Sequence, residues 1–119
     1  MKRTLRVALT GFAALLASAS LTVLAESGSI TILAPHEGAS LASGAPSTLD
    51  YTVHLSPNGS HLHVYVDDQN PIVVRKVTDC PCSVPLPALT PGKHVLLIKE
   101  ATAAHSPTGV QSSVTVTAK

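Results

Sequence analysis

Alternation of apolar and polar residues with a period of two is the feature that most constrains how this chain folds. It recurs in short segments after residue 26, and Pro, Gly and Asn separate one segment from the next. Such alternation places apolar side chains on one face of a β-strand and polar side chains on the other. Pro and Gly also interrupt every long window, so no stretch after residue 25 shows a helical period. The pattern predicts an all-β domain.

Seven segments have the composition of strands, and each is bounded by turn residues. They are residues 29–33, 48–55, 61–67, 72–77, 83–89, 93–101 and 110–118. The fifth contains Pro85 and Pro87, which lack backbone donors and therefore suit an edge strand. Seven short strands of this kind predict a sandwich of two sheets.

The first 25 residues have the features of a secretory signal peptide. Lys and Arg form a charged start, residues 7–25 form an apolar stretch, and Val-Leu-Ala at 23–25 suits a cleavage site. An uncleaved membrane anchor is the alternative, but small polar residues within the stretch favour removal. We therefore expect a signal peptide at 1–25, a mature domain at 26–119, and a periplasmic or secreted location. No second long apolar run follows, so we expect no membrane span after signal removal.

Removal of the signal changes the sign of the net charge. The whole chain has a formal charge of +1, but three of its eight basic residues lie in the signal. The remaining chain then has five basic and seven acidic residues, which gives a formal net charge of −2. No basic stripe remains, so we expect no nucleic-acid partner. The sequence also lacks a Gly-x-Ser-x-Gly elbow, a phosphate-binding loop and a His-Glu-x-x-His motif, so we predict that the protein is not an enzyme.

Several segments resemble known exported domains. Leu-Thr-Pro-Gly-Lys-His at 89–94 resembles the corner before strand F of immunoglobulin-like and fibronectin type III domains. Ile-x-Ile-Leu-x-Pro at 30–35, with Gly38-Ala39, resembles bacterial immunoglobulin-like domains. Residues 61–67 together with 91–94 resemble a group of small exported bacterial domains of unknown function. The chain lacks the buried Trp and the cysteine pair between sheets that mark immunoglobulin domains.

The resemblance implies an all-β, seven-stranded, two-sheet immunoglobulin-like sandwich with strands A, B, C, C′, E, F and G. In that topology the B–C, C′–E and F–G connections lie at one end. It further implies that His94 is a corner residue at the opposite end, partly buried and bonded to nearby backbone.

Two short motifs, a His-x-His at 61–63 and a Cys-Pro-Cys at 80–82, contain residues suited to bind a metal ion. Residues two apart on a strand share a face, with backbones about 6.5–7 Å apart, so two such imidazoles can chelate one ion. The implied strand order brings both motifs to the end that holds the F–G connection. Thiolate with imidazole suits copper(I) or zinc. The candidate ligands are His61, His63, Cys80, Cys82 and His105, with His54 as a further one.

Both motifs also have structural interpretations. Because Leu62 and Val64 belong to the core face, His61 and His63 also fit the solvated face of a strand. The cysteines admit three interpretations, which are a local Cys80–Cys82 disulfide, a metal-bound thiolate pair, and intermolecular disulfides.

Two functional hypotheses follow from these patterns. The leading one is an exported, non-enzymatic binding or accessory module for a protein partner, acting through one sheet face and one loop pole. On that face Val95 and Leu97 are expected to lie beside His63 and Tyr65, forming a partly apolar patch. The alternative is a periplasmic protein that binds copper or zinc through the His-x-His and Cys-x-Cys motifs.

Overall fold

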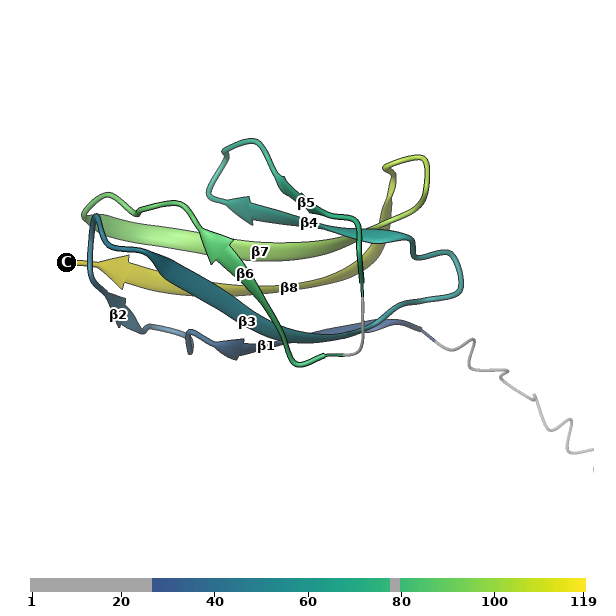
Figure 1. The fold of residues 1–119 in the computed structure, drawn as a ribbon, viewed down its shortest axis with the longest axis horizontal. Coiled ribbons are helices and arrows are strands. Elements are labelled where there is room, and N and C mark those ends of the chain that lie inside the picture. Colours follow the sequence, from purple (N-terminus) through teal and green to yellow (C-terminus); the bar gives the residue numbers. More distant parts are fainter. Residues whose placement is uncertain (1–26, 78–79) are drawn as a thin grey trace, which may run out of the picture.

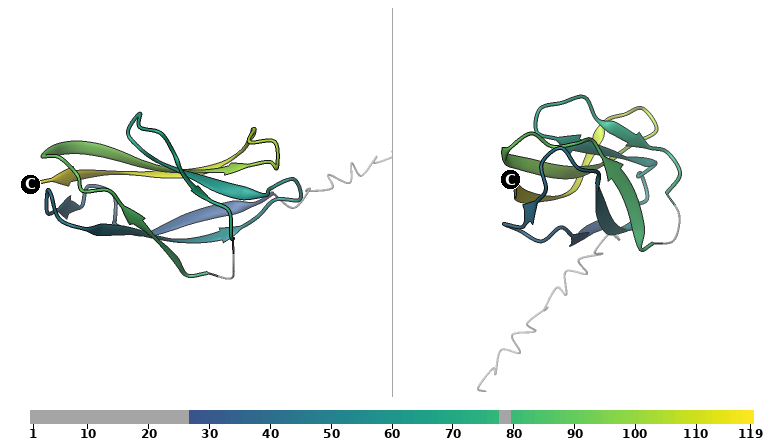
Figure 2. Two further views of the ribbon diagram at one scale, coloured as in Figure 1. Left: turned by 45° about the horizontal axis from the view of Figure 1, so that its top comes forward. Right: turned by 60° about the vertical axis from the view of Figure 1, so that its left-hand side comes forward.

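Two sheets pack face to face in the computed structural model, which describes residues 27–77 and 80–119 (Figure 1). One sheet has the order β1-β3-β6 and the other β2-β8-β7-β4-β5. Both layers are visible in the two views of Figure 2. The strands are β1 (Ser29–Ala34), β2 (Ser40–Leu41), β3 (Ser47–His54), β4 (His61–Val66), β5 (Ile72–Val74), β6 (Cys82–Leu86), β7 (Gly92–Ala101) and β8 (Pro107–Ala118).

The predicted all-β sandwich is confirmed, with one more strand among the described residues than the sequence indicated. The addition is β2, which pairs in parallel with the end of β8 and is too short to show a period. β5 ends at Val74 rather than at residue 77, and β8 begins at Pro107 because that residue pairs with Ala101. The predicted signal peptide lies outside the described residues. Within the described part of the chain, no helix is long and apolar enough to cross a membrane.

The core lies between the sheets and is built by the alternation seen in the sequence. Leu49 and Tyr51 of β3 face inward from one sheet, and the other sheet contributes fully buried residues from three strands. These are Leu62, Val64, Leu96, Ile98 and Val116. Burying each such side chain contributes roughly 1.5–3 kcal/mol. The inward residues of β4 and β7 therefore fix which of their neighbours project from the outer face.

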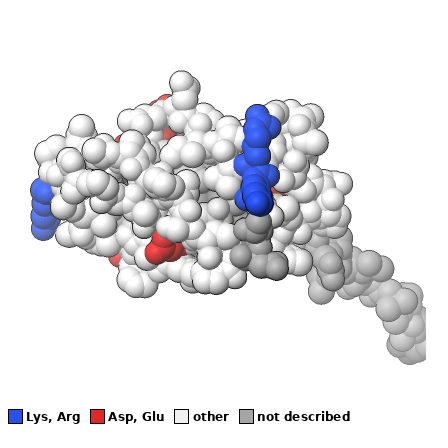
Figure 3. Space-filling view, in the orientation of Figure 1, with Lys and Arg blue, Asp and Glu red and all other residues white. Residues whose placement is uncertain are grey.

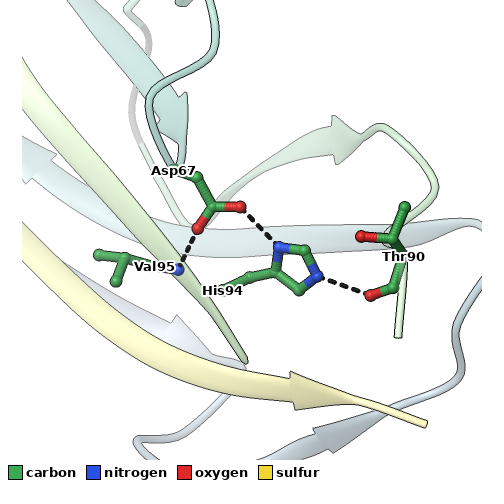
Figure 4. A network of polar contacts seen from close by, with 4 residues as sticks. All are labelled: Asp67, Thr90, His94 and Val95. Atoms are coloured by element: carbon green, nitrogen blue, oxygen red, sulfur yellow. Dashed lines mark hydrogen bonds and ion pairs between the residues drawn. The ribbon is translucent and has the colours of Figure 1, made fainter. Parts of the chain in front are cut away.

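The corner before β7 is held by a polar network, shown in Figure 4. The His94 ring lies between two acceptors, with Nδ1 2.6 Å from Asp67 Oδ2 and Nε2 2.6 Å from the Thr90 carbonyl oxygen. The Val95 amide donates to Asp67 Oδ1 over 2.8 Å. Asp67 has a φ of 54°, a conformation that Asp and Asn adopt more readily than most residues. The predicted corner role of His94 is confirmed.

Replacement of Asp67 by Asn is expected to lower stability most at mildly acidic pH. The hydrogen bond to Asp67, followed by that to Thr90, raises the pKa of His94. The charged form of His94 therefore stabilises the fold fully below about pH 6.5, and this stabilisation is lost as pH rises through the raised pKa. Burial alone would raise the pKa of Asp67, but the hydrogen bond from His94 outweighs it and lowers that pKa. The stabilisation by the Asp67 carboxylate is therefore lost only as pH falls through the lowered pKa. Because the pair is partly exposed, we expect a loss of about 1 kcal/mol near pH 5 and less near pH 9.

Urea unfolding of both proteins at the two pH values measures this difference. Asn tolerates the positive φ, so the change removes the charge without adding backbone strain. An equal loss at both pH values would show that the ion pair does not contribute.

Candidate metal centre

His61 and His63 project from the outer face of the five-stranded sheet. Leu62 and Val64 of β4 are fully buried in the core, so the residues between and before them face the opposite way. The start of β4 is fixed to the end of β7, because Ser60 N donates to the Ala101 carbonyl oxygen over 2.9 Å. Despite its outward direction, His61 is only 3% exposed.

His105 reaches the same place from the loop between β7 and β8. The loop closes on itself, because Thr102 N donates to Ser106 O over 2.8 Å and His105 N donates to Thr102 O over 2.9 Å. His105 has a φ of 63°, which is uncommon for a residue with a side chain. In Figure 1 this loop and the start of β4 lie at the same end of the sandwich. The backbone thus holds an exposed histidine in an unusual conformation beside the other two.

The three imidazoles converge on one point. His61 Nε2 lies 3.0 Å from His63 Nε2 and 3.1 Å from His105 Nδ1, and the last two atoms are 3.3 Å apart. The rings are tilted rather than stacked, with interplanar angles of 49°, 68° and 33°. Three ring nitrogens therefore form a nearly equilateral triangle.

Hydrogen bonds alone cannot satisfy this triangle. Each contact needs one N–H and one lone pair, but each nitrogen offers only one of the two. With three atoms in mutual contact, at least two are alike, so at least one contact sets donor against donor or lone pair against lone pair. A cation above the triangle would accept all three lone pairs at once.

The triangle also has the dimensions of a metal site. Zinc–nitrogen bonds of 2.0–2.1 Å in a tetrahedron place ligand nitrogens about 3.3–3.4 Å apart. The observed separations fall within a few tenths of an ångström of this spacing. His61 Nδ1 lies 3.2 Å from Ser60 Oγ, and when Nε2 binds an ion, Nδ1 carries the hydrogen and can donate it to this hydroxyl. Such an outer hydrogen bond orients a metal-binding imidazole.

The surroundings favour the neutral form of two of the rings. Burial, followed by the charges of His105, His63 and Arg75, lowers the pKa of His61. Burial, followed by the charges of His105 and Arg75, lowers the pKa of His63. Both rings therefore offer lone pairs down to a lower pH than a solvated histidine does.

Glu100 joins the two segments that carry the histidines. This carboxylate is fully buried on the inner side of β7. It accepts from the Ser56 amide over 2.9 Å, from the Ser56 hydroxyl, and from the Thr108 hydroxyl over 2.7 Å. Ser56 precedes the histidines of β4, whereas Thr108 follows the His105 loop. Burial alone would raise the pKa of Glu100, but hydrogen bonds from Ser56 and Thr108 outweigh it and lower that pKa.

Gly59 lets the backbone before β4 pass close to the Glu100 carboxylate. A Cβ built on Gly59 would lie 2.5 Å from Glu100 Cδ, so no larger residue fits without displacing the carboxylate. Sequence reasoning missed Glu100, although a signal was present. It shares the parity of Leu96 and Ile98, which predicts an inward-facing acid in an apolar strand.

The structure separates the predicted ligands into two groups. Among the described residues, His61, His63 and His105 form the one cluster of three or more ligand atoms, all within 4.8 Å of one another. Cys80 and Cys82 are joined to each other by a disulfide, and Cys82 belongs to the other sheet through its pairing with Tyr51. His54 ends β3 in that same sheet and is not part of the cluster.

Comparisons with known proteins identify the fold. No protein-family model matches the chain, and no curated protein is similar to it in sequence. The fibronectin(III)-like modules of Clostridium thermocellum CbhA align with a TM-score of 0.60 and 16% identity, covering 76% of this chain and 96% of theirs. A superoxide reductase (neelaredoxin) from Ignicoccus hospitalis aligns with a TM-score of 0.45 and 17% identity, over 76% of this chain and 80% of its own. The first likeness shows that the chain is a small fibronectin type III-like sandwich.

Proposed function

We propose that this protein is an exported, non-enzymatic module that binds a divalent transition-metal ion through His61, His63 and His105. The observation that supports this most is the triangle of ring nitrogens, 3.0–3.3 Å on a side. Three neutral imidazoles suit zinc and copper, and affinity at such a site favours copper(II) over zinc. Export is proposed from the signal-like residues 1–25, and the Cys80–Cys82 disulfide fits an oxidising compartment.

The cysteines are not needed in this proposal, and that gives a direct test. Titration of the mature domain with Zn²⁺ or Cu²⁺ is expected to show one ion per chain. The double change Cys80→Ser/Cys82→Ser is expected to alter affinity by less than about threefold, because the sulfurs are bonded to each other and lie outside the cluster. Isothermal titration and elemental analysis measure both quantities. A loss of tenfold or more, or the absence of stoichiometric metal, would contradict a site made of histidines alone.

A second candidate function is the binding of a protein partner by the outer face of the five-stranded sheet. Val95 is 44% exposed and Val73 39% exposed, and Tyr65 pairs with Leu97 between them. Figure 3 draws the side of the molecule on which β6 of the three-stranded sheet lies in front (compare Figure 1), and few charged side chains appear there. Photo-crosslinking from position 95 in cells tests this function, and position 33, a Leu that is 41% exposed on the other sheet, is the matched control. Equal crosslinking from both positions would reject it.

A further inference from the structure

We infer that the metal ion keeps one coordination position open toward a small cavity, where it takes a small exogenous anion. This inference rests on the proposed function, because it concerns the same three histidines. Zinc held by three protein ligands keeps its fourth position for water or another exchangeable ligand, whereas zinc sites that only stabilise a fold are closed by four protein ligands. The cluster supplies three ligands among the described residues.

A cavity adjoins two of the three histidines. Its volume is about 70 Å³, and it is lined by His63 and His105 together with Tyr65, Lys99 and Pro107. A cavity needs only about 10–15 Å³ of such space to hold one water molecule, so this one can hold an anion of two or three heavy atoms. The space beside His63 and His105 therefore has room for a small ligand.

The charges around the cavity favour an anion. Imidazole ligands are neutral, so they leave the full charge of a divalent ion uncompensated. Lys99 lines the cavity, and the charge of Arg75 acts on both His61 and His63. Glu100 also borders the cavity, but its carboxylate is hydrogen-bonded to Ser56 and Thr108.

Lys99 is placed to attract that anion. It pairs directly with His63 across the β4–β7 ladder, and its Nζ lies 5.7 Å from the centre of the Tyr65 ring. The ring face attracts the ammonium group and holds it over the outer surface of the sheet. A wider cleft of about 300 Å³ continues past Tyr65, but it is lined by Asp67 and Asp68, whose charges disfavour a long anionic ligand.

Azide added to the Cu²⁺-loaded protein tests the inference, because an azide bound to copper produces a charge-transfer absorption band. We expect a saturable band in a chloride-free buffer. Lys99→Gln is expected to weaken azide binding about tenfold while changing copper affinity less than about twofold. Lys93→Gln, at the exposed start of the same strand, is the matched control and is expected to change neither.

The outcomes separate this inference from the proposed function. If copper binds stoichiometrically but azide gives no band, the fourth position is closed, and the inference is wrong while the metal site stands. If copper does not bind, the inference is wrong, and the proposed function is wrong as well if Zn²⁺ does not bind either. If Lys93→Gln weakens azide binding as much as Lys99→Gln, the effect is one of overall charge and the role of Lys99 is wrong. Thermal unfolding of both variants confirms that each is folded.

Discussion

Replacement of His105 by Asn is expected to weaken Zn²⁺ and Cu²⁺ binding by about 100-fold or more. His105 supplies one of three ring nitrogens and is the only one contributed by a loop rather than by β4. Mutation of a residue that only hydrogen-bonds to a metal ligand typically lowers metal affinity about 10–100-fold. Loss of a direct ligand should therefore reach or exceed that range. Asn also suits the positive φ of this position, so the variant removes the ring without straining the loop.

His36→Asn is the matched control, because His36 is an exposed histidine outside the cluster. Isothermal titration of the mature domain and both variants measures the effect, with thermal unfolding to show that stability is similar. If His105→Asn binds either ion as tightly as the control, the triangle of nitrogens is not the metal site.

Replacement of Glu100 by Leu is expected to lower the free energy of unfolding by about 3 kcal/mol or more. The change leaves one part-buried amide and two hydroxyl groups, those of Ser56 and Thr108, without their acceptor. Such groups cost about 1–3 kcal/mol each when unsatisfied, although the two hydroxyls recover part of this by rotating. Urea unfolding monitored by circular dichroism measures the difference.

Glu100→Gln provides the graded control. Its carbonyl oxygen still accepts from the Ser56 amide, and its NH₂ group donates to hydroxyls that reverse their direction, so we expect a loss of about 1 kcal/mol. Because the pKa of Glu100 is lowered, its charge stabilises the fold above its ordinary value of 4.5, and that contribution is lost as pH falls through the lowered pKa. The gap between wild type and Glu100→Gln should therefore narrow in acid. Equal losses for Leu and Gln would show that the carboxylate acts by packing alone.

Both predictions concern one end of the sandwich, where a single acid connects the two segments that hold the histidines. If Glu100 positions these segments, Glu100→Gln should also weaken metal binding, by less than the loss of a ligand. The inner face of β7 thus determines the arrangement of side chains on the outer face.

Most strands of this chain could be predicted from short stretches of its sequence. Alternation in 61–67 and 93–101 predicts strands because a side-chain period of two has one solution in a regular backbone. β2 gave no such signal, since two residues cannot show a period. The end of β5 was also misplaced, because the segment ends on a further β-branched residue, Val77, whereas pairing with β4 stops at Val74.

The candidate site also depends partly on local sequence and partly on how distant segments pack. Its two histidines on β4 share a face in any strand, so their partnership was readable from 61–63 alone. The third ligand depended on which loops lie together, and here the strand order implied by resemblance brought His105 to the correct end. The same topology placed the cysteines nearby, yet they are bonded to each other, because two thiols one residue apart meet more easily than they reach another sheet.

By itself, then, the sequence determined the all-β class, the inward and outward faces of each long strand, and the pairing of His61 with His63. Only the tertiary structure decided that His105 completes the cluster and that Glu100 connects the β3–β4 loop with the start of β8. The physical reason is the separation along the chain of the residues that interact. A side-chain period is set by neighbouring backbone bonds, whereas the distance between residues more than forty positions apart is set by how the two sheets pack.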